Sequence, residues 1–525
     1  MNHQIQEIFE RVVEPLADRI AKRKLLLILF FSIFYFLGFC LIASQKVMWN
    51  DELFTFYIAR LPHFSDIWKA LLTGAEQTPP LSYVVTRFFW GLFGVTSLST
   101  RLPEMVGVWF MGLCLLALVW RRTTFLYGFV AMLFPLITEV FHFATEARAY
   151  ALVLGFSAFA LLCWLWATEG RQRALALVGL AASVAAAVSS HYYAVLILFP
   201  LSLGELVRSI ARKKIDLAVW VSLCLGLTPL LFFLPLIESA RSYAPHFWAK
   251  PHWVSMLDFY HRFLLPPTIL GMAVILGFVM AYSAFRPASR VARPPLRVPV
   301  HEFAAVWGFI LIPVVGVVLA KTVIGAYDDR YAFPAVVGVC VVVGWGLYCA
   351  FDGSPAMALA VSLMLFGAMI AKDIRSYHSM VDDRTARAGT YAFLEQYAKG
   401  SAPIVIANPG PFVELSHRPP ADIRSRLLYL VDPGLALQDT ATDDVERGVV
   451  AMKHWAGMNV RSFPSYVASG HRCFIYVQNY PDQYEWLIPE LIKIHWKLRV
   501  VGWQGLDVLF SAGPGENSGS PSGGK

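Results

Sequence analysis

Two adjacent carboxylates, Asp51 and Glu52, follow an apolar run of membrane-spanning length at residues 25–44. A charged side chain at the mouth of a membrane bundle is costly unless water solvates it or the protein uses it. A carboxylate in that position can take a proton from a substrate hydroxyl, as a general base does. Asp51 and Glu52 are therefore the first candidate catalytic residues.

Three further polar turns are predicted at the same membrane face. They lie at residues 146–150, 189–193 and 327–331, and they contribute Glu146, Arg148, His191, Arg330 and Tyr331. The planar fork of an arginine matches the oxygens of a phosphate. Such a face could hold an anionic lipid head group while a carboxylate deprotonates an acceptor.

Each of these residues also has a structural interpretation when it is considered alone. The two carboxylates could be solvated loop charges, and Glu146 and Arg148 could form a clamp with each other. A histidine such as His191 in a tight turn is more often a hydrogen-bonded interfacial residue, and tyrosines belong to any aromatic belt. The functional interpretation depends on their common location, not on one residue.

Oxygen ligands for a divalent metal are present, but we do not expect a cofactor to be required. The carboxylates of Asp51, Glu52, Asp328 and Asp329 could hold Mg²⁺ or Mn²⁺ if they converge. Arginines at the same face already offer phosphate neutralisation. The seven cysteines are scattered without metal-ligand spacing, and no protein metal site is predicted.

The composition is that of a polytopic membrane protein. Apolar residues make up 57% of the 525 residues, charged residues only 15%, and the mean hydropathy is +0.55. Runs of spanning length recur, and we predict eleven crossings: 25–44, 101–120, 125–143, 149–168, 174–190, 192–207, 215–236, 268–285, 302–322, 331–349 and 355–371. The net charge of +8 resides mainly in short loops and does not indicate nucleic acid.

The positive-inside rule orients these crossings in an inner membrane. A cytoplasmic N-terminus, residues 1–24, ends in basic residues, and later inner loops carry arginines at 121–122, 171–173, 212–214 and 286–297. The long first outer loop spans 45–100. Its apolar stretch 81–95 is predicted to lie along the interface, because a crossing there would reverse every later loop and would bury Arg87.

The C-terminal part differs in composition from the membrane domain at 25–371. Short β-rich runs at 403–407, 427–431, 473–477 and 498–501 alternate with helical stretches such as 384–398 and 483–493. This pattern predicts a soluble extracytoplasmic α/β domain over 372–512. Residues 513–525 are rich in Gly, Ser and Pro and are predicted to be disordered.

An ordered set of short motifs resembles the integral-membrane glycosyltransferases of the GT-C class. The match is best to the bacterial branch with protein O-mannosyltransferase-like enzymes and the aminoarabinose transferase of lipid A. The motifs are Trp49–Glu52, Thr78–Tyr83, Ser99–Pro103, Glu146–Leu152, His191–Tyr193 and Arg330–Pro334.

The resemblance implies transfer of a hexosyl or pentosyl group from a polyprenyl-phosphate-linked donor, with inversion. Asp51 then corresponds to the acidic residue of the first outer loop, with Glu52 beside it. Glu146 and Arg148 match a turn with active-site polar groups, and Arg330 and Tyr331 match a motif that we assign to the donor phosphate. The acceptor is a glycan, lipid or protein hydroxyl. His191 is expected to assist the arginines.

Two other classes of protein fit parts of the pattern. A transporter or flippase of lipid-linked sugars would also need outer arginines, but the sequence has no inverted repeat, and its charges are not at mid-membrane. A membrane scaffold that presents the tail gives no reason for Asp51, Glu146 and Arg330 at one face. The ordered motifs therefore favour the enzyme.

Overall fold

The structure is a computed structural model that describes residues 12–263, 266–285, 294–482 and 485–515. The chain divides into two compact units. A helical unit comprises Met1–Gln45, Thr78–Pro235 and Ala249–Met380, and an α/β unit comprises Lys46–Gln77, Leu236–Trp248 and Val381–Lys525. The predicted domain limits at 24/25, 371/372 and 512/513 stay predictions.

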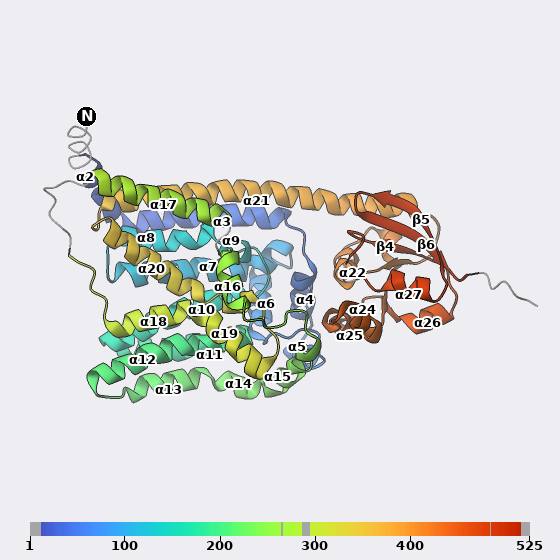
Figure 1. Ribbon diagram of the computed structural model, residues 1–525, viewed down its shortest axis with the longest axis horizontal. Helices are drawn as coiled ribbons and strands as arrows, with labels where there is room; N and C mark the ends of the chain where they lie inside the picture. The colour runs from blue at the N-terminus through green and yellow to red at the C-terminus, as the bar shows by residue number, and fades with distance from the viewer. Residues whose placement is uncertain (1–11, 264–265, 286–293, 483–484, 516–525) are drawn as a thin grey trace, which may run out of the picture. The chain divides into compact units, whose positions relative to one another are not determined.

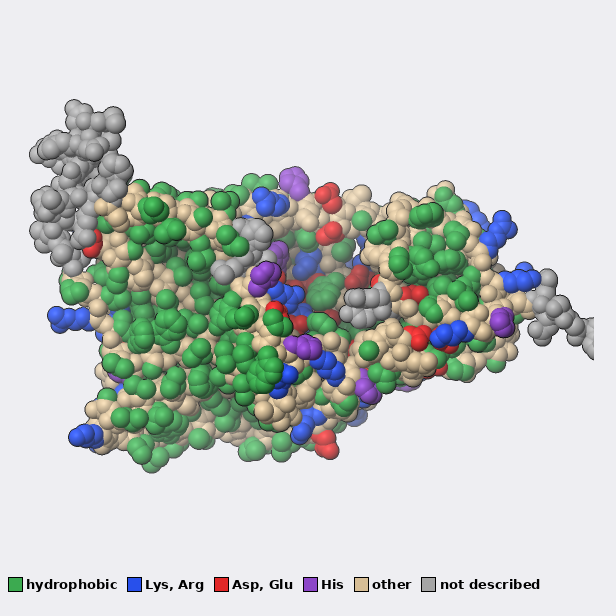
Figure 2. Space-filling model, viewed as in Figure 1, with side chains coloured by type: hydrophobic (Ala, Val, Ile, Leu, Met, Phe, Trp, Pro, Cys, Tyr) green, Lys and Arg blue, Asp and Glu red, His purple; other side chains and the backbone are tan. Residues whose placement is uncertain are grey.

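The helical unit is built from apolar helices of membrane-spanning length. Within the described ranges, six helices are long and apolar enough to cross: α3 (Lys24–Gln45), α7 (Ser97–Trp120), α10 (Tyr150–Glu169), α11 (Arg173–Ser190), η3 with α12 (Tyr192–Arg212), and α21 (Pro355–Tyr397). A helix hydrogen-bonds its own backbone polar groups, and this is required in the membrane because hydrocarbon offers them no hydrogen-bond partners. Figure 2 shows hydrophobic side chains spread over the visible face of this unit.

Other apolar segments are interrupted or short. The span from α18 (Val300–Ile310) to α19 (Ile312–Leu319) is bent by 54°, and Pro313 lies in the first turn of α19, where its ring cannot continue the preceding helix. Counting three such bent pairs as single spans raises the total among the described residues to nine. Three apolar helices are shorter: α6 (Leu81–Phe93), α8 with η2 (Phe125–Ile137) and α20 (Ala335–Ala350).

Every predicted crossing overlaps a helix, and the predicted polytopic helical fold is confirmed. The number of crossings stays a prediction. The stretch 81–95 is helical as α6, which ends at Gly94 in a positive-φ conformation that favours glycine. The interfacial placement of α6 also stays a prediction. Of the predicted inner loop 286–297, residues 286–293 lie outside the described residues.

Close packing of α7 on α10 fixes the turn that carries Glu146 and Arg148. Gly107 in α7 has no room for a side chain, because a Cβ there would lie 2.6 Å from the carbonyl oxygen of Ala151. A Cβ on Gly155 would lie 2.8 Å from the carbonyl oxygen of Gly107. Small residues of this kind let membrane helices approach closely. The N-terminal turn of α10 is thus held directly against α7.

At other helix ends, charged side chains are paired. Glu302 in α18 binds both Arg121 and Arg122, and Arg208 bonds Glu205 at 2.8 Å and Asp216 at 2.6 Å. Charges that are buried in a membrane protein normally find such partners. Several of the basic residues that were predicted to set topology therefore also join helices together.

The α/β unit contains a six-stranded sheet in the order β3-β2-β1-β4-β6-β5 (Figure 1). The strands are β1 (Ile404–Ile406), β2 (Leu427–Val431), β3 (Val460–Ser462), β4 (Cys473–Val477), β5 (Lys497–Gln504) and β6 (Asp507–Gly513). The first four are parallel, and β6 pairs antiparallel with β4 and β5. The apolar core of the α/β unit includes Val405, Leu428, Ile475 and Trp486.

The four predicted strands are present as β1, β2, β4 and β5. The predicted helix 384–398 is the last part of α21, and the predicted helix 483–493 appears as α27 (Leu487–Lys493), with residues 483–484 outside the described residues. Strands β3 and β6 were not predicted. Of the tail 513–525, Gly513 ends β6, and residues 516–525 lie outside the described residues.

The segment predicted to form the first outer loop, residues 45–100, supplies two helices to the α/β unit. They are α4 (Asn50–Ala59) and α5 (Phe64–Leu72). Helix α4 packs against α22 (Pro409–Ser416) and α25 (Asp444–Ala456), which belong to the C-terminal part of the chain. The segment with Asp51 and Glu52 is therefore part of the same compact body as the sheet.

Candidate active site

Three distant turns of the chain meet in the helical unit. Tyr150 begins α10, His191 ends α11, and Tyr331 lies in the short helix η6 (Asp329–Ala332). The ring of His191 is 4.8 Å from that of Tyr331 and 5.5 Å from that of Tyr150, and Tyr193 stacks on Tyr331 at 4.6 Å. We call Tyr150, His191, Tyr193, Arg330 and Tyr331 the aromatic–arginine cluster. The predicted convergence of these turns is present.

His191 is a neutral, buried imidazole. Burial, together with the nearby charges of Arg148 and Arg330, lowers its pKa to about 3, against an opposing effect of Asp328. Its Nδ1 accepts the backbone N–H of Tyr193 at 3.2 Å, which leaves the proton on Nε2. His191 can therefore donate a hydrogen bond, but it does not bring a positive charge at neutral pH.

Arg330 is held by Asp328. The Arg330 Nε and a terminal nitrogen donate to the two carboxylate oxygens at 2.8 and 3.3 Å, and its backbone N–H donates at 2.9 Å. The guanidinium carbon also lies 5.5 Å from the centre of the Tyr150 ring, a cation–π distance. Arg330 is thus fixed in direction before any ligand arrives, and part of its charge is balanced.

Glu146 and Arg148 lie in the turn that precedes α10, and both are partly exposed. The turn is tight, since the Arg148 backbone N–H donates to the Glu146 carbonyl at 2.7 Å. The guanidinium of Arg148 acts on His191 together with that of Arg330. Two positive charges therefore face the neutral histidine from separate turns.

Sequence reasoning missed an arginine of this region. Arg262, in α16 (Ser255–Phe263), lies 3.7 Å from Asp329 and 4.0 Å from Asp328 and is 56% exposed. Burial and the neighbouring Asp328 raise the pKa of Asp329 to about 6, and Arg262 opposes this. Arg262 lies in the predicted outer loop 237–267, and no motif surrounds it. Its location in an outer loop was therefore the one sequence signal that could have marked Arg262 as a site residue.

Lys372 is a second cation that the sequence did not single out. Its ammonium donates to the Thr138 carbonyl at 2.8 Å and lies 4.4 Å from the centre of the Phe141 ring. The charges of both Lys372 and Arg262 act on Glu139. Cations from α16 and α21 are thereby added to the end of the helical unit that holds Arg148 and Arg330.

Asp51 and Glu52 belong to the α/β unit, whereas the other five predicted site residues belong to the helical unit. Glu52 is fully buried and closes the first turn of α4, where its carboxylate accepts the Trp49 backbone N–H at 3.5 Å. Glu52 is therefore not a solvated loop charge. Asp51 is partly exposed in the same turn, where the helix dipole favours a negative charge.

No cluster of three or more potential metal ligands (His, Cys, Asp or Glu) occurs among the described residues. Asp328 and Asp329 contact Arg262 and Arg330, and Asp51 and Glu52 lie in the other unit. The expectation that the protein requires no divalent cation stays a prediction.

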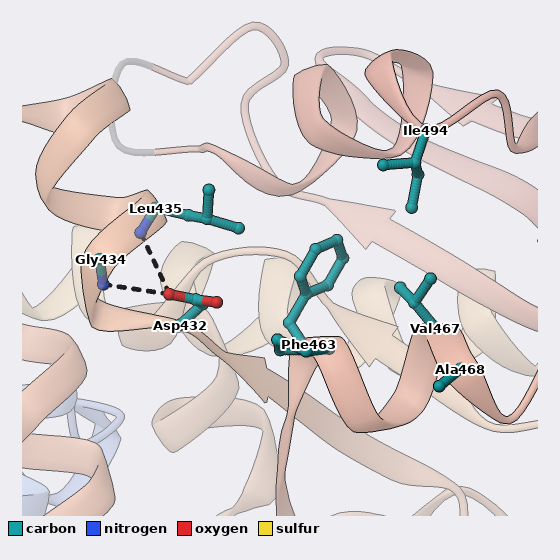
Figure 3. A pocket seen from close by; sticks show the side chains of 8 residues that line it. Asp432, Gly434, Leu435, Phe463, Val467, Ala468 and Ile494 are labelled. Atoms are coloured by element: carbon teal, nitrogen blue, oxygen red, sulfur yellow. Dashed lines mark hydrogen bonds between the residues drawn. The ribbon is translucent and has the colours of Figure 1, made fainter.

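A cavity of about 530 Å³ lies in the α/β unit (Figure 3), and none of the predicted site residues lines it. Apolar side chains such as Leu435, Phe463 and Ile494 line it. Its one carboxylate, Asp432, accepts the backbone N–H groups of Gly434 and Leu435 at 3.1 Å. Because that carboxylate caps a helix, the cavity offers no constellation for sugar or phosphate chemistry.

The overall fold matches known structures, although the sequence alone finds no relative. No protein-family model matches the chain, and neither does any curated protein. Among solved structures, ArnT from Cupriavidus metallidurans in the apo state aligns with a TM-score of 0.56 and 13% identity, over 93% of this chain and 97% of ArnT. ArnT bound to undecaprenyl phosphate aligns with a TM-score of 0.55 and 12% identity, over 92% and 97%.

A third structure, an Archaeoglobus fulgidus oligosaccharyltransferase in complex with Zn and sulfate, aligns with a TM-score of only 0.37 and 11% identity. It covers 84% of this chain and 67% of that one, a similarity too weak to support a structural argument. The two ArnT alignments show the fold. They confirm the predicted architecture, a polytopic helical domain with a C-terminal α/β domain.

Proposed function

Since the chain has the fold of ArnT, a GT-C aminoarabinose transferase of lipid A, we propose that it is a membrane glycosyltransferase. Its donor is a sugar linked to a polyprenyl phosphate, and its acceptor is a hydroxyl group. The observation that carries this proposal is the aromatic–arginine cluster together with the neighbouring Arg148, because Arg148 and Arg330 both face a neutral His191. The binding of undecaprenyl phosphate to ArnT supports a donor of this class.

The donor phosphate is bound by the cations at this end of the helical unit. Arg330 and Arg148 neutralise the phosphate, and the exposed Arg262 adds a third positive charge. The Nε2–H of His191 donates to a phosphate oxygen. Charge and dipoles that are fixed in advance stabilise a developing negative charge more than groups that must reorganise. Asp328 supplies that fixation for Arg330.

Transfer is a single displacement with inversion. Asp51 takes the proton of the acceptor hydroxyl, and the resulting oxygen attacks the anomeric carbon opposite the phosphate. The bond between the anomeric carbon and the phosphate oxygen breaks, and polyprenyl phosphate leaves with the electron pair. Because no covalent enzyme intermediate forms, a second carboxylate nucleophile is not required. Glu52 orients the first turn of α4, and Glu146 orients the acceptor.

The reaction takes place on the extracytoplasmic side of the inner membrane. This orientation follows from the basic residues of the short predicted inner loops, with the N-terminus in the cytoplasm. Impermeant labelling of a cysteine substituted at the exposed position Asp422 would test the orientation directly.

The test uses the full-length protein in nanodiscs with a panel of radiolabelled polyprenyl-phosphate sugars. We compare the wild type with Asp51→Asn, and with Asp422→Asn as a control on the exposed surface. Wild type and control should release polyprenyl phosphate and label an acceptor in a membrane extract. Asp51→Asn should bind the donor but release at least about 100-fold less product, the loss typical of a missing general base.

Two outcomes contradict the proposal. If Asp51→Asn keeps near-normal turnover, Asp51 is not the base. If the labelled lipids bind and no donor is ever consumed, the protein is not a transferase, and the transporter or flippase interpretation takes precedence.

A further inference from the structure

The start of helix α4 is attached to the C-terminal part of the chain by a partly buried ion pair. The backbone N–H of Asn50 donates to Glu414 Oε1 at 3.2 Å, and Arg387 binds the other carboxylate oxygen of Glu414. Glu414 lies in α22 and Arg387 in α21. We propose that Glu414 and Arg387 are positioning residues that hold the first turn of α4, and with it Asp51, in its catalytic direction.

Asn50 transmits this attachment to Asp51. Its side-chain Oδ1 accepts the backbone N–H of Asp51 at 2.9 Å. The same side chain lies against the first turn of α22, where a Cβ added to Gly410 would be 3.5 Å from its Nδ2. The residue before the proposed base is thus in contact with α22 through both its backbone and its side chain.

Arg387 compensates the negative charge of Glu414 next to the first turn of α4. Burial raises the pKa of Glu414, the negative charge of Glu52 raises it further, and Arg387 with the Asn50 N–H opposes both. Without Arg387, the partly buried carboxylate of Glu414 and the buried carboxylate of Glu52 would repel each other at the start of α4. Like charges at short range are destabilising. Arg387 therefore favours the charged form of Glu414, which accepts the Asn50 N–H.

The rest of α4 is fixed as well, which sets its rotation about the helix axis. The Tyr57 hydroxyl and His417 Nδ1 share a hydrogen bond of 3.1 Å, and the rings of Phe56 and His417 are 5.2 Å apart. A Cβ added to Gly448 in α25 would lie 3.8 Å from the Phe54 ring. Because both ends of α4 are held, loss of one attachment should turn the Asp51 carboxylate more than it displaces that carboxylate.

The inference deepens the proposed function and rests on it, since it assigns to the C-terminal part of the chain a task at the reaction centre. Misplacement of a reacting group by about 1 Å can cost up to about 100-fold in rate. A lost attachment should lower kcat, whereas donor affinity, which depends on residues of the helical unit, should stay unchanged.

The experiment compares Glu414→Ala and Glu414→Gln with Glu490→Ala in the full chain in nanodiscs. Glu490 is a matched control, because it also pairs with a cation, Lys493, in the α/β unit. Hydrogen exchange is measured on the peptide that contains residues 49–53, together with kcat and KM for the lipid donor. Glu414→Ala should speed exchange in that peptide and lower kcat by about 10- to 100-fold at unchanged KM. Glu490→Ala should do neither.

Glu414→Gln keeps an oxygen acceptor for Asn50 but loses the charge for Arg387, and its kcat should fall between those of wild type and Glu414→Ala. It is the decisive variant if Glu414→Ala does not fold. Unchanged exchange at residues 49–53 would overturn the positioning inference whether or not the protein is active. The same holds if exchange rises but kcat does not fall. Failure of the proposed function is distinguished by an active Asp51→Asn variant.

Discussion

Lowering the pH should destabilise the folded protein through His191, and the size of this effect depends on how far the surroundings of His191 lower its pKa. Burial, with Arg148 and Arg330, lowers the pKa of His191 from 6.5 to about 3. Between these two values the unfolded chain takes up a proton and the folded chain does not. Stability from the neutral imidazole is therefore complete above about pH 6.5 and is lost as the pH falls toward 3.

The expected loss follows from the linkage relation. At pH 5.0 the unfolded state gains about 2 kcal/mol from protonation of this one histidine, since each pKa unit is worth about 1.4 kcal/mol. At pH 7.5 the gain is negligible. The variant His191→Gln keeps a neutral side chain with a hydrogen-bond donor but has no imidazole to protonate. Between pH 7.5 and 5.0 its free energy of unfolding should therefore decrease by about 2 kcal/mol less than that of the wild type.

The measurement is SDS-induced unfolding in mixed micelles at both pH values, followed by tryptophan fluorescence. The difference between wild type and His191→Gln isolates this group from the other carboxylates and histidines, which titrate in both proteins. Equal pH dependence in the two proteins, within about 0.5 kcal/mol, would refute a buried neutral His191 between two arginines. A titration of His191 near pH 6.5 by NMR would do the same.

Two further substitutions test the scaffold of the cluster. Asp328→Ala removes three hydrogen bonds from Arg330, which is 18% exposed. This variant should lose about 3–5 kcal/mol of stability and most donor turnover, whereas the surface variant Asp422→Ala should keep both. Equal melting curves for the two variants would contradict this prediction. Gly107→Val should lower thermal stability by at least about 1–3 kcal/mol, because its Cβ meets the α10 backbone, whereas Gly346→Ala has open space and should be neutral. A stable Gly107→Val protein would disprove the close contact.

The elements that could be predicted from the sequence are those with strong local signals. Apolar length predicted the helices that begin at Tyr150 and end before His191, and short apolar runs predicted β1 and β2. Strand β3, Val460–Ser462, is only three residues long and largely exposed, and it depends on its pairing with β2. Such pairing is a tertiary effect that no short window contains.

The candidate site was predictable as a set of turns but not as a set of contacts. Outer-loop position and charge singled out Arg148, His191 and Arg330. Arg262 carries no motif, and its place beside Asp328 follows only from how α16 packs. Glu52 shows the same limit, because its charge was visible in the sequence, whereas its complete burial in the first turn of α4 depends on tertiary packing.

The antiparallel pair α10 and α11 also bears on which insertions and deletions the gene can tolerate. Tyr150 begins α10 and His191 directly follows α11, so both spans must have matching lengths for the two rings to meet. One extra codon within α11 would shift His191 by about 1.5 Å and turn it by about 100° around the helix axis. Extra codons at the exposed turn Gly170–Gln172 would leave both ends in register. Length variation in natural or engineered versions of this chain should therefore accumulate at that turn and be absent from the helices on either side.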